Sequence, residues 1–171
     1  MRNTNTNMDT NTNINMKIEI RKAAACDAQV IYNIIKESFK KYVKEAKIPV
    51  TIDALEENIE DVIKDIESKE VFIAFLNGIP AGTIRVETIT DDTALITRFG
   101  VLPEYQNNGI GRALLNHTDN FLISKGIKKV YLYTASKHAN LIRFYYNTGF
   151  YVDSTTKDKG YTRALMVKEY E

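Results

Sequence analysis

The hydrophobic and polar positions divide the chain into segments that alternate between strand-like and helix-like periodicity. In residues 16–23, MKIEIRKA, apolar and polar side chains alternate, which predicts a strand. From Asp27, an expected N-cap, apolar side chains recur at helical spacing, and Pro49 should end that helix. A second helix is predicted to begin at Thr51 or Asp53 and to bury an apolar stripe of Leu55, Ile59, Val62 and Ile66.

The middle of the chain predicts a hairpin, a strand and a helix in succession. Residues 70–89 carry two β-rich runs around an Asn-Gly pair, the usual signature of a tight hairpin. Residues 93–101, TALITRFGV, should form the next strand, and a helix over 110–125 should close at a Lys-Gly pair. The remaining predicted elements are a strand over 127–135, a short helix over 138–148 ended by Gly149, and a last hairpin of 150–154 with 161–170.

This order of elements predicts a mixed α/β sheet in a single domain. The strand–helix–strand unit over 93–135 requires parallel neighbours with a right-handed crossover, whereas the hairpins require antiparallel ones. We expect residues 16–171 to form this domain. Residues 1–15 are mostly Asn and Thr, too polar to bury much apolar surface, so we expect them to be a disordered tail.

Composition and charge narrow the class of protein. The formal net charge of +1 gives no reason to expect nucleic acid or a membrane as a partner. Cys26 is the only cysteine, which excludes an internal disulfide framework and favours a reducing compartment. Because no run of about eighteen apolar residues is present, no transmembrane helix is expected. A cytoplasmic location is therefore predicted.

The stretch PEYQNNGIGRALLNH, residues 103–117, places two glycines without a lysine between a predicted strand and a predicted helix. At such a junction the first peptide N–H groups of the helix have no partner and converge on one point at the positive end of the helix dipole. Glycine lets the backbone approach a bulky anion closely. The pattern favours a cradle for a diphosphate, although an ordinary polar loop would also fit it locally.

Two other phosphate-binding loops do not match this stretch. A Walker loop needs Gly-Lys followed by Ser or Thr, which the chain lacks. A dinucleotide fingerprint would place Gly or Ala where Leu114 stands, and an acidic residue near the end of the following strand. That region carries Lys128, Lys129 and Tyr131 instead, so a nicotinamide cofactor is not expected.

Two motifs at this spacing resemble a known family. The first is Gln106-x-x-Gly-x-Gly-x-x-Leu114, preceded by RFGVLPEY, and the second runs from Phe144 through Tyr145 to a Gly-Phe pair ending at Phe150. Together they resemble the GNAT superfamily of acyl-CoA N-acyltransferases over residues 16–168. The resemblance implies a central mixed sheet that splays between two parallel strands, with about four flanking helices. It also implies acetyl-CoA as co-substrate and no metal.

The resemblance implies which residues hold coenzyme A. The backbone of Phe99 to Val101 would pair with the pantetheine arm, and the N–H groups of Asn107 to Arg112 would hold the diphosphate. The family often has Asn seven residues before the tyrosine; this chain has His138 there, which could equally be a helix-start histidine, with Asn140 as a substitute. The full set of expected cofactor residues is Phe99, Gly100, Val101, Gln106, Asn107, Asn108, Gly109, Ile110, Gly111, Arg112, His138, Asn140 and Tyr145.

Acyl transfer from a thioester to an amine suggests three catalytic roles. Tyr145 is the expected general acid for the departing thiolate, and the N–H of Val101 the expected donor to the oxyanion. The predicted strand 93–101 has no carboxylate, so Glu87 on the neighbouring strand is a candidate base. Deprotonation through water, or an acceptor of low amine pKa, would need no such group.

We expect the acceptor to be a primary amine on a small molecule or a peptide. The acidic second helix could steer a cation such as a polyamine, an amino sugar or a lysine-bearing acceptor, but the lysines of the first helix could neutralise it. We therefore predict an N-acetyltransferase. A non-catalytic acyl-CoA-binding sensor and a protein N-terminal or lysine acetyltransferase are the alternatives. Edge strands near the C-terminus could pair two copies in a homodimer.

Overall fold

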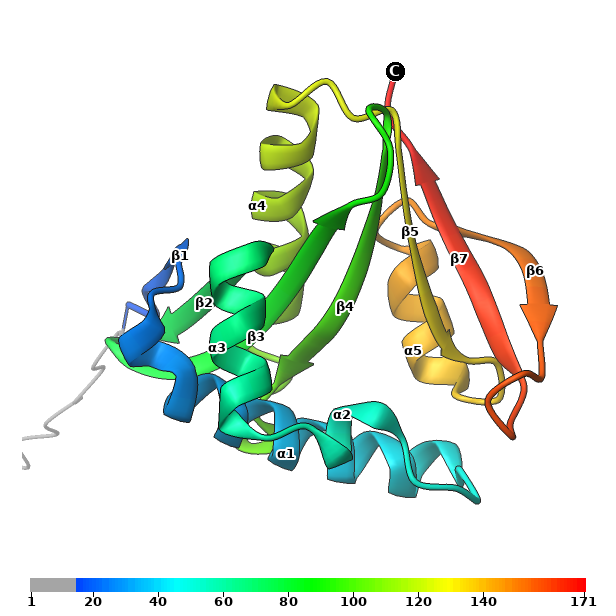
Figure 1. Cartoon of the computed structure of the whole chain (residues 1–171), viewed down its shortest axis with the longest axis horizontal. Coiled ribbons are helices and arrows are strands. Elements are labelled where there is room, and N and C mark those ends of the chain that lie inside the picture. The colour runs from blue at the N-terminus through cyan, green and yellow to red at the C-terminus, as the bar shows by residue number, and fades with distance from the viewer. Residues whose placement is uncertain (1–14) are drawn as a thin grey trace, which may run out of the picture.

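The structure, a computed structural model, describes residues 15–171 as one seven-stranded sheet with helices on both faces (Figure 1). The strands are β1 (Ile18–Lys22), β2 (Glu70–Leu76), β3 (Ile79–Thr88), β4 (Thr93–Val101), β5 (Lys129–Ala135), β6 (Tyr151–Thr156) and β7 (Arg163–Glu169). The helices are α1 (Ala28–Ala46), α2 (Asp53–Glu56), α3 (Ile59–Ser68), α4 (Ile110–Ser124) and α5 (Ala139–Tyr146), with 3₁₀ turns η1 (Ala25–Asp27) and η2 (Pro103–Tyr105). The predicted disordered tail lies, apart from Asn15, outside the described residues.

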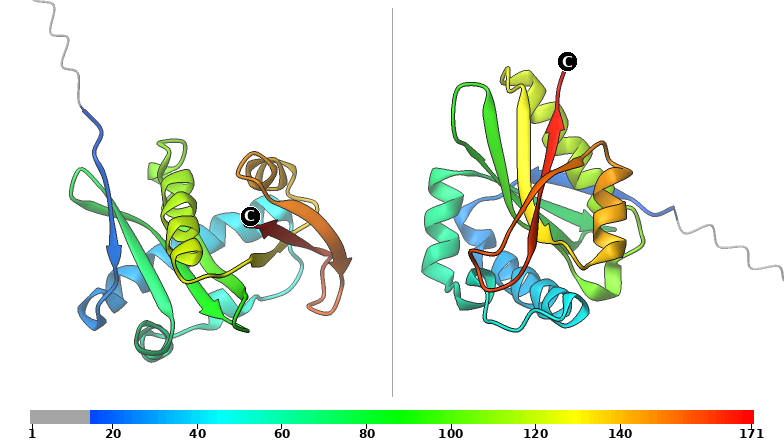
Figure 2. Two further views of the ribbon diagram at one scale, coloured as in Figure 1. Left: turned by 90° about the horizontal axis from the view of Figure 1, so that it is seen from above. Right: turned by 90° about the vertical axis from the view of Figure 1, so that its right-hand side faces the viewer.

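The sheet lies between two helical layers, each with its own apolar core. The strand order is β1-β2-β3-β4-β5-β7-β6. Helices α1 and α3 cover one face, where Ile31, Ile35, Val62 and Ile73 are buried together. Helices α4 and α5 cover the other face over Leu114, Leu132 and Met166, as the view from above shows (Figure 2). No helix within residues 15–171 is long and apolar enough to cross a membrane.

The sheet parts in its middle, between β4 and β5. Every other neighbouring pair is antiparallel, but β4 and β5 are parallel and pair only over 93–95 with 129–131. Beyond that point the strands diverge toward their C-terminal ends (Figure 1). The predicted mixed sheet with splayed parallel strands is therefore confirmed, and the divergence exposes the inner edge of β4.

A bulge in β4 bends this strand just before its open end. The register between β3 and β4 shifts between Thr83 and Arg85, and Arg98 adopts a left-handed backbone conformation with φ of 48°. Next to it, Gly100 lies against α1 so closely that a Cβ there would clash with Oγ of Ser38. Because a bulge re-aims the strand beyond it, these contacts set the direction of residues 99–101.

The predicted second helix is wrong in one respect, because it is broken into α2 and α3. The backbone of Glu57 leaves helical geometry at ψ of 139°, and Asn58 starts α3 as an N-cap that accepts a bond from the N–H of Asp61 at 2.9 Å. The break also rotates the buried face, so Ala54 is buried in place of Leu55. The local periodicity was continuous across the break and carried no sign of it.

Asp27 is the N-cap residue of α1, as predicted, but its side chain makes its bonds elsewhere. Its carboxylate accepts from the N–H of Ala24 at 2.8 Å and from both terminal nitrogens of Arg21, so it caps η1 and makes no cap bond to α1. The Arg21 guanidinium holds the pKa of the Asp27 carboxyl below its usual range. This pair ties β1 to the start of α1.

A buried ion cluster explains the break between α2 and α3. The side chain of Arg85, on β3, is fully buried and donates to both oxygens of Glu57 at 2.6 and 2.8 Å, and to Asp65 at 2.8 Å. Arg98 donates to the same Glu57 carboxylate at 3.3 Å. Because a buried guanidinium requires partners, the chain must turn at Glu57 to bring the carboxylate to it. The cluster thereby joins α2, α3 and the bulge in β4.

We expect Arg85→Met to lower the free energy of unfolding by about 3 kcal/mol, because it leaves the buried Glu57 carboxylate with only its weaker partner. Urea unfolding followed by circular dichroism measures this. Lys17→Met is the matched control: it breaks a pair with Glu19 whose side chains are 72% and 54% exposed. That control should change the free energy by less than about 0.5 kcal/mol. Equal effects of the two substitutions would contradict the assigned role of the cluster.

Candidate active site

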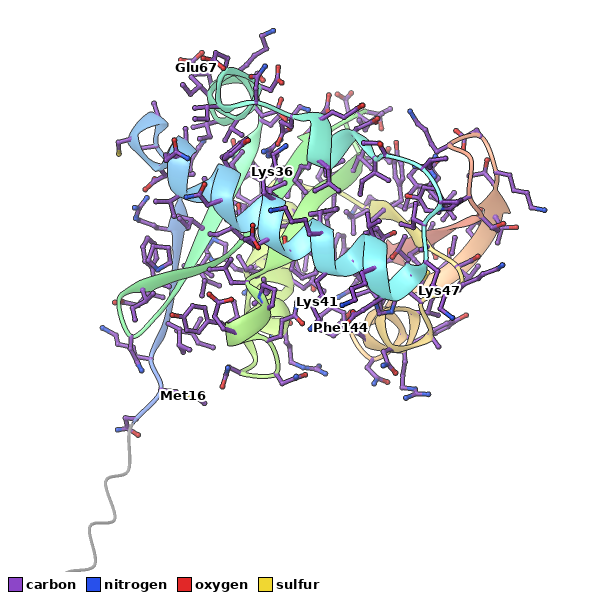
Figure 3. The ribbon with its side chains drawn as sticks, turned by 90° about the horizontal axis from the view of Figure 1, so that it is seen from below. Met16, Lys36, Lys41, Lys47, Glu67 and Phe144 are labelled. Atoms are coloured by element: carbon purple, nitrogen blue, oxygen red, sulfur yellow. The ribbon has the colours of Figure 1, made fainter. Side chains whose placement is uncertain are left out.

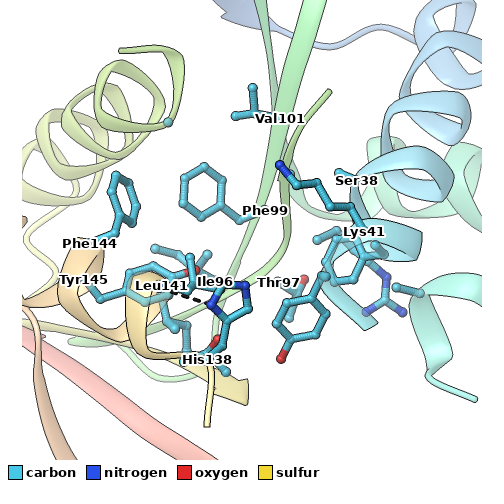
Figure 4. A pocket seen from close by; sticks show the side chains of 18 of the residues that line it. Ser38, Lys41, Ile96, Thr97, Phe99, Val101, His138, Leu141, Phe144 and Tyr145 are labelled. Atoms are coloured by element: carbon cyan, nitrogen blue, oxygen red, sulfur yellow. Dashed lines mark hydrogen bonds between the residues drawn. The ribbon is translucent and has the colours of Figure 1, made fainter. Parts of the chain in front are cut away.

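A cavity of about 870 Å³ opens where β4 and β5 diverge. Residues from β4, the loop before α4, α4 itself, α5 and α1 line it (Figure 4). Of the residues that the sequence singled out for cofactor binding, the cavity brings together Phe99, Gly100, Val101, Gln106, Asn107, Gly109, Ile110, Gly111, Arg112, His138, Asn140 and Tyr145. Asn108 is not part of the lining, because its side chain donates back to the carbonyl oxygens of Tyr105 and Gln106.

The N-terminus of α4 presents unpaired peptide N–H groups to this cavity. The first intrahelical bond runs from the N–H of Ala113 to the carbonyl of Gly109 at 2.9 Å, and no side chain caps the helix. The N–H groups of residues 109–112 therefore have no partner within the helix. Aligned N–H groups at the positive end of a helix attract an anion, so the geometry fits a diphosphate.

Two residues give the loop before α4 its shape. Asn107 and Gly109 both have left-handed backbones, with φ of 64° and 81°. Such a conformation suits Asn and Gly and is strained for most other side chains. At Gly111, an added Cβ would meet Phe144 at 3.4 Å and Phe99 at 3.6 Å, so this glycine leaves the space between the two rings open. Gly109 thus allows the turn before α4, and Gly111 keeps the approach to the helix N-terminus open.

The open edge of β4 presents the backbone of Val101. The N–H of Leu102 donates to the carbonyl of Ala81 on β3 at 2.8 Å. Since successive N–H groups of a strand point to opposite sides, the N–H of Val101 points away from β3, toward the opening between β4 and β5. Its carbonyl accepts a bond from Nε2 of Gln106 at 3.1 Å. A donor is therefore available at the position expected for an oxyanion contact.

Tyr145 lies in the second turn of α5 and lines the same cavity. The residue is 5% exposed and packs against Phe99, Phe144 and Phe150. Burial raises the pKa of its hydroxyl well above the ordinary value, with a smaller contribution from Tyr42. The hydroxyl consequently stays protonated at neutral pH, as a proton donor must.

His138 acts as the N-cap of α5. Its Nδ1 accepts from the N–H of Leu141 at 3.3 Å, and its Nε2 lies 3.1 Å from the carboxylate of Glu45 on α1. A ring nitrogen that accepts from a peptide N–H carries no proton, which assigns the proton to Nε2. The ring also stacks on Tyr42. His138 therefore combines the helix-start role with a place in the cavity wall, while Asn140 is exposed beside it.

The candidate base Glu87 lies elsewhere. It is not among the residues of the cavity wall, and its carboxylate is 3.3 Å from Nζ of Lys69. Within the part of the chain that the structure describes, the carboxylates that line the cavity are those of Glu45 and Asp53. The same residues contain no group of three or more His, Cys, Asp or Glu that could hold a metal ion.

The sequence analysis singled out no individual residue of α1 for the cavity. Ser38, Lys41, Tyr42 and Glu45 from this helix line the cavity, and the hydroxyl of Tyr42 accepts from the N–H of Ala135 at the end of β5 at 2.7 Å. The helical spacing of Lys41, Tyr42 and Glu45 was visible in the sequence as one polar face. Nothing local distinguished that face from a solvated surface.

The far end of the cavity, away from α4, is formed by α1, α2 and the β6–β7 loop. Tyr42, Glu45, Asp53, Lys159 and Tyr161 line this end. Nζ of Lys159 lies 3.6 Å from the carboxylate of Asp53, which links the β6–β7 loop to the start of α2. The described residues thus leave room for a second molecule opposite the α4 cradle.

The model of a protein family, the acetyltransferase (GNAT) family, matches residues 29–150 of the chain. A spermidine N(1)-acetyltransferase from Thermoplasma acidophilum is 28% identical over 172 residues, which cover 90% of this chain and 98% of that protein. A ribosomal-protein bS18 alanine N-acetyltransferase from Escherichia coli is 32% identical over 74 residues, 43% of this chain and 49% of that enzyme.

A solved structure gives the same result. The PaiA N-acetyltransferase of Thermoplasma acidophilum, crystallised in complex with coenzyme A, superposes with a TM-score of 0.77 at 25% identity. The match covers 91% of this chain and 100% of the PaiA chain. The similarity therefore extends over nearly the whole of the described fold.

We expect Gly111→Asp to weaken the binding of coenzyme A about tenfold or more relative to Gly111→Asn, because a carboxylate at the start of α4 repels a diphosphate. The two substitutions have nearly the same size, so the difference between them isolates charge. Isothermal titration with coenzyme A measures it. Because an acidic residue in the first turn favours the helix, Gly111→Asp should not be less stable than Gly111→Asn. Equal affinities would show that the diphosphate is held elsewhere.

Proposed function

The chain belongs to the acetyltransferase (GNAT) family, and we propose that it acetylates a primary amine of a polyamine-like cation. It is an N-acetyltransferase that uses acetyl-CoA as the donor. One observation carries the proposal for the site: the open edge of β4 and the uncapped N-terminus of α4 line one cavity. The edge suits an extended pantetheine arm and the helix suits a diphosphate.

The residues at the divergence of β4 and β5 have distinct roles in the proposed reaction. The N–H of Val101 donates to the thioester oxygen and stabilises the negative charge that develops when the amine attacks the carbonyl carbon. A carbon–nitrogen bond forms, and the carbon–sulfur bond then breaks. Tyr145 gives its hydroxyl proton to the departing sulfur and regains one from solvent. Both residues line the same cavity, as this sequence of events requires.

The amine must lose a proton before or during attack, because a free alkylamine has a pKa of about 10.4. Glu87 does not line the cavity and is paired with Lys69, so we do not propose it as the base. Glu45 and Asp53 line the cavity, but each has a cationic or imidazole partner. We therefore propose that water in the open far end of the cavity accepts the proton of the amine and passes it to solvent.

The far end of the cavity supports a flexible cation as the acceptor. Tyr42 and Tyr161 supply aromatic surface for methylene groups, and an ammonium group of the acceptor would take the place of Nζ of Lys159 beside the carboxylate of Asp53. The similarity to a spermidine N(1)-acetyltransferase over nearly the whole chain points to the same chemical class. A polyamine combines both features, since it alternates apolar segments with ammonium groups.

A protein N-terminal amine is the second candidate acceptor, favoured by the 74-residue match to a ribosomal-protein alanine N-acetyltransferase. That match covers less than half of each chain, so it carries less weight than the match to the spermidine enzyme. A non-catalytic acyl-CoA sensor would not need a buried tyrosine in the cavity wall. The cytoplasmic location and the homodimer expected from the sequence stay predictions.

Tyr145→Phe should lower kcat about a hundredfold or more, because no proton donor remains for the thiolate. The KM for acetyl-CoA should change little, since the ring and its packing are retained. Steady-state assays of thiol release measure both constants. Tyr146→Phe is the matched control, because the adjacent ring is 52% exposed and outside the cavity wall. Full activity of Tyr145→Phe would remove this hydroxyl from the mechanism.

A panel of acceptors at fixed acetyl-CoA tests the proposed substrate class. Spermidine and related polyamines should give the highest kcat/KM, a monoamine of similar length a lower value, and peptides with free N-termini the lowest. The reason is that only polyamines present both apolar segments and several charges to the far end of the cavity. Mass spectrometry of the products identifies the acetylated nitrogen. A preference for peptides would favour the second candidate, and no turnover of any amine would favour the sensor.

A further inference from the structure

A continuous chain of polar contacts crosses the cavity from the end of β4 to the start of α5. Nε2 of Gln106 donates to the carbonyl of Val101 at 3.1 Å, and Oε1 of Gln106 accepts from Nζ of Lys41 at 2.5 Å. Lys41 lies 3.6 Å from Glu45 one turn along α1, and the other oxygen of Glu45 lies 3.1 Å from Nε2 of His138. We call Gln106, Lys41, Glu45 and His138 the α1 strap.

The strap joins two parts of the active site that the sheet does not hold together. Val101 ends β4, and α5 follows the end of β5. These strands stop pairing at Leu95 and Tyr131, so no strand hydrogen bond fixes the distance between their C-terminal ends. Helix α1 runs across one face of the sheet, with Lys36 and Lys41 on it and Lys47 just past its C-terminal end (Figure 3). It can therefore connect both ends.

Each end of the strap holds a reacting group of the proposed mechanism. At one end Gln106 fixes the carbonyl of Val101, whose N–H is on the same edge of the strand. At the other end His138 caps α5, and Tyr145 lies seven residues later, about two helical turns away on the same face. Figure 4 shows Lys41, Val101, His138 and Tyr145 around the one cavity.

We propose that Lys41 and its partners in the α1 strap are positioning residues, which set the separation between the Val101 N–H and the Tyr145 hydroxyl. This inference rests on the proposed roles of those two groups. Lys41 and Glu45 are 35% and 46% exposed, so their ion pair contributes little to stability. The strap therefore acts on the geometry of the reaction. Its loss should lower kcat much more than it lowers the stability of the fold.

The decisive variant is Lys41→Met, which keeps the aliphatic stem and removes the ammonium. We expect kcat to fall about tenfold or more, because a small misplacement of reacting groups is costly. The melting temperature and the affinity for coenzyme A should stay at the wild-type values. Lys40→Met is the matched control, since Lys40 pairs with Glu37 at 2.8 Å and does not line the cavity. It should leave kcat unchanged.

Lys41→Arg should restore most of the lost kcat, because a guanidinium can also donate to Gln106 and pair with Glu45. A kcat in Lys41→Met equal to that of Lys40→Met would overturn the proposal. So would a loss of coenzyme A affinity in proportion to the loss of rate, because Lys41 would then be a ligand contact. Tighter binding of coenzyme A would overturn the proposal as well, because the strap would then obstruct the binding site.

A double substitution tests whether the strap works as one unit. Asn is a good N-cap residue, so His138→Asn keeps the start of α5 while its shorter side chain no longer reaches Glu45. If the strap is continuous, Lys41→Met with His138→Asn should lose no more kcat than the more damaging single substitution. Losses that multiply would mean two independent effects and would contradict the proposal.

Hydrogen exchange separates a failure of this proposal from a failure of the proposed function. In the full-length protein with coenzyme A, Lys41→Met should speed amide exchange in both residues 101–107 and residues 139–146, and Lys40→Met in neither. This readout needs no acceptor. Faster exchange in both segments without turnover of any amine would support the α1 strap and contradict the proposed acetylation of a polyamine. Unchanged amide exchange at residues 139–146 would contradict the proposal for the α1 strap, whatever the enzymatic activity.

Discussion

The early end of pairing between β4 and β5 is the constraint on which the site depends. A strand edge exposed to water readily pairs with another extended chain. Here α1, α4 and α5 surround the exposed edge of β4, so an extended molecule reaches it only through the cavity. The same divergence opens the space beside the first turn of α4. One departure from regular sheet structure thus exposes the backbone groups that we propose for the two halves of coenzyme A.

Most of the fold followed from the sequence because its signals are local. The Asn-Gly turn, with φ of 50° and 82°, and the order of elements needed only neighbouring residues. The break at Glu57 could not be predicted, because its cause is the buried guanidinium of Arg85 on a strand that comes later in the chain. An apolar stripe runs through the break without interruption, so periodicity alone predicts one helix. The ion cluster, which joins residues far apart in the sequence, breaks that helix in two.

The site was predictable to the same extent. The residues of the loop before α4 are contiguous, so their spacing predicted a cradle, and the resemblance to a family supplied the other expected cofactor residues, most of which line the cavity. Lys41 and Glu45 come from a helix far away in the chain, and their role appears only when that helix crosses beneath the divergence. At position 138 the histidine keeps the capping chemistry that an asparagine would supply, so the departure from the family pattern preserves the start of α5.

The N-terminus of α4 has a consequence for the stability of the protein. The first N–H groups of this helix have no partner within it, and a diphosphate bound there would become their cap. Whatever binds only the native state shifts the unfolding equilibrium in its favour. Coenzyme A or an acyl thioester bound there would therefore raise the free energy of unfolding, and more so at higher concentration.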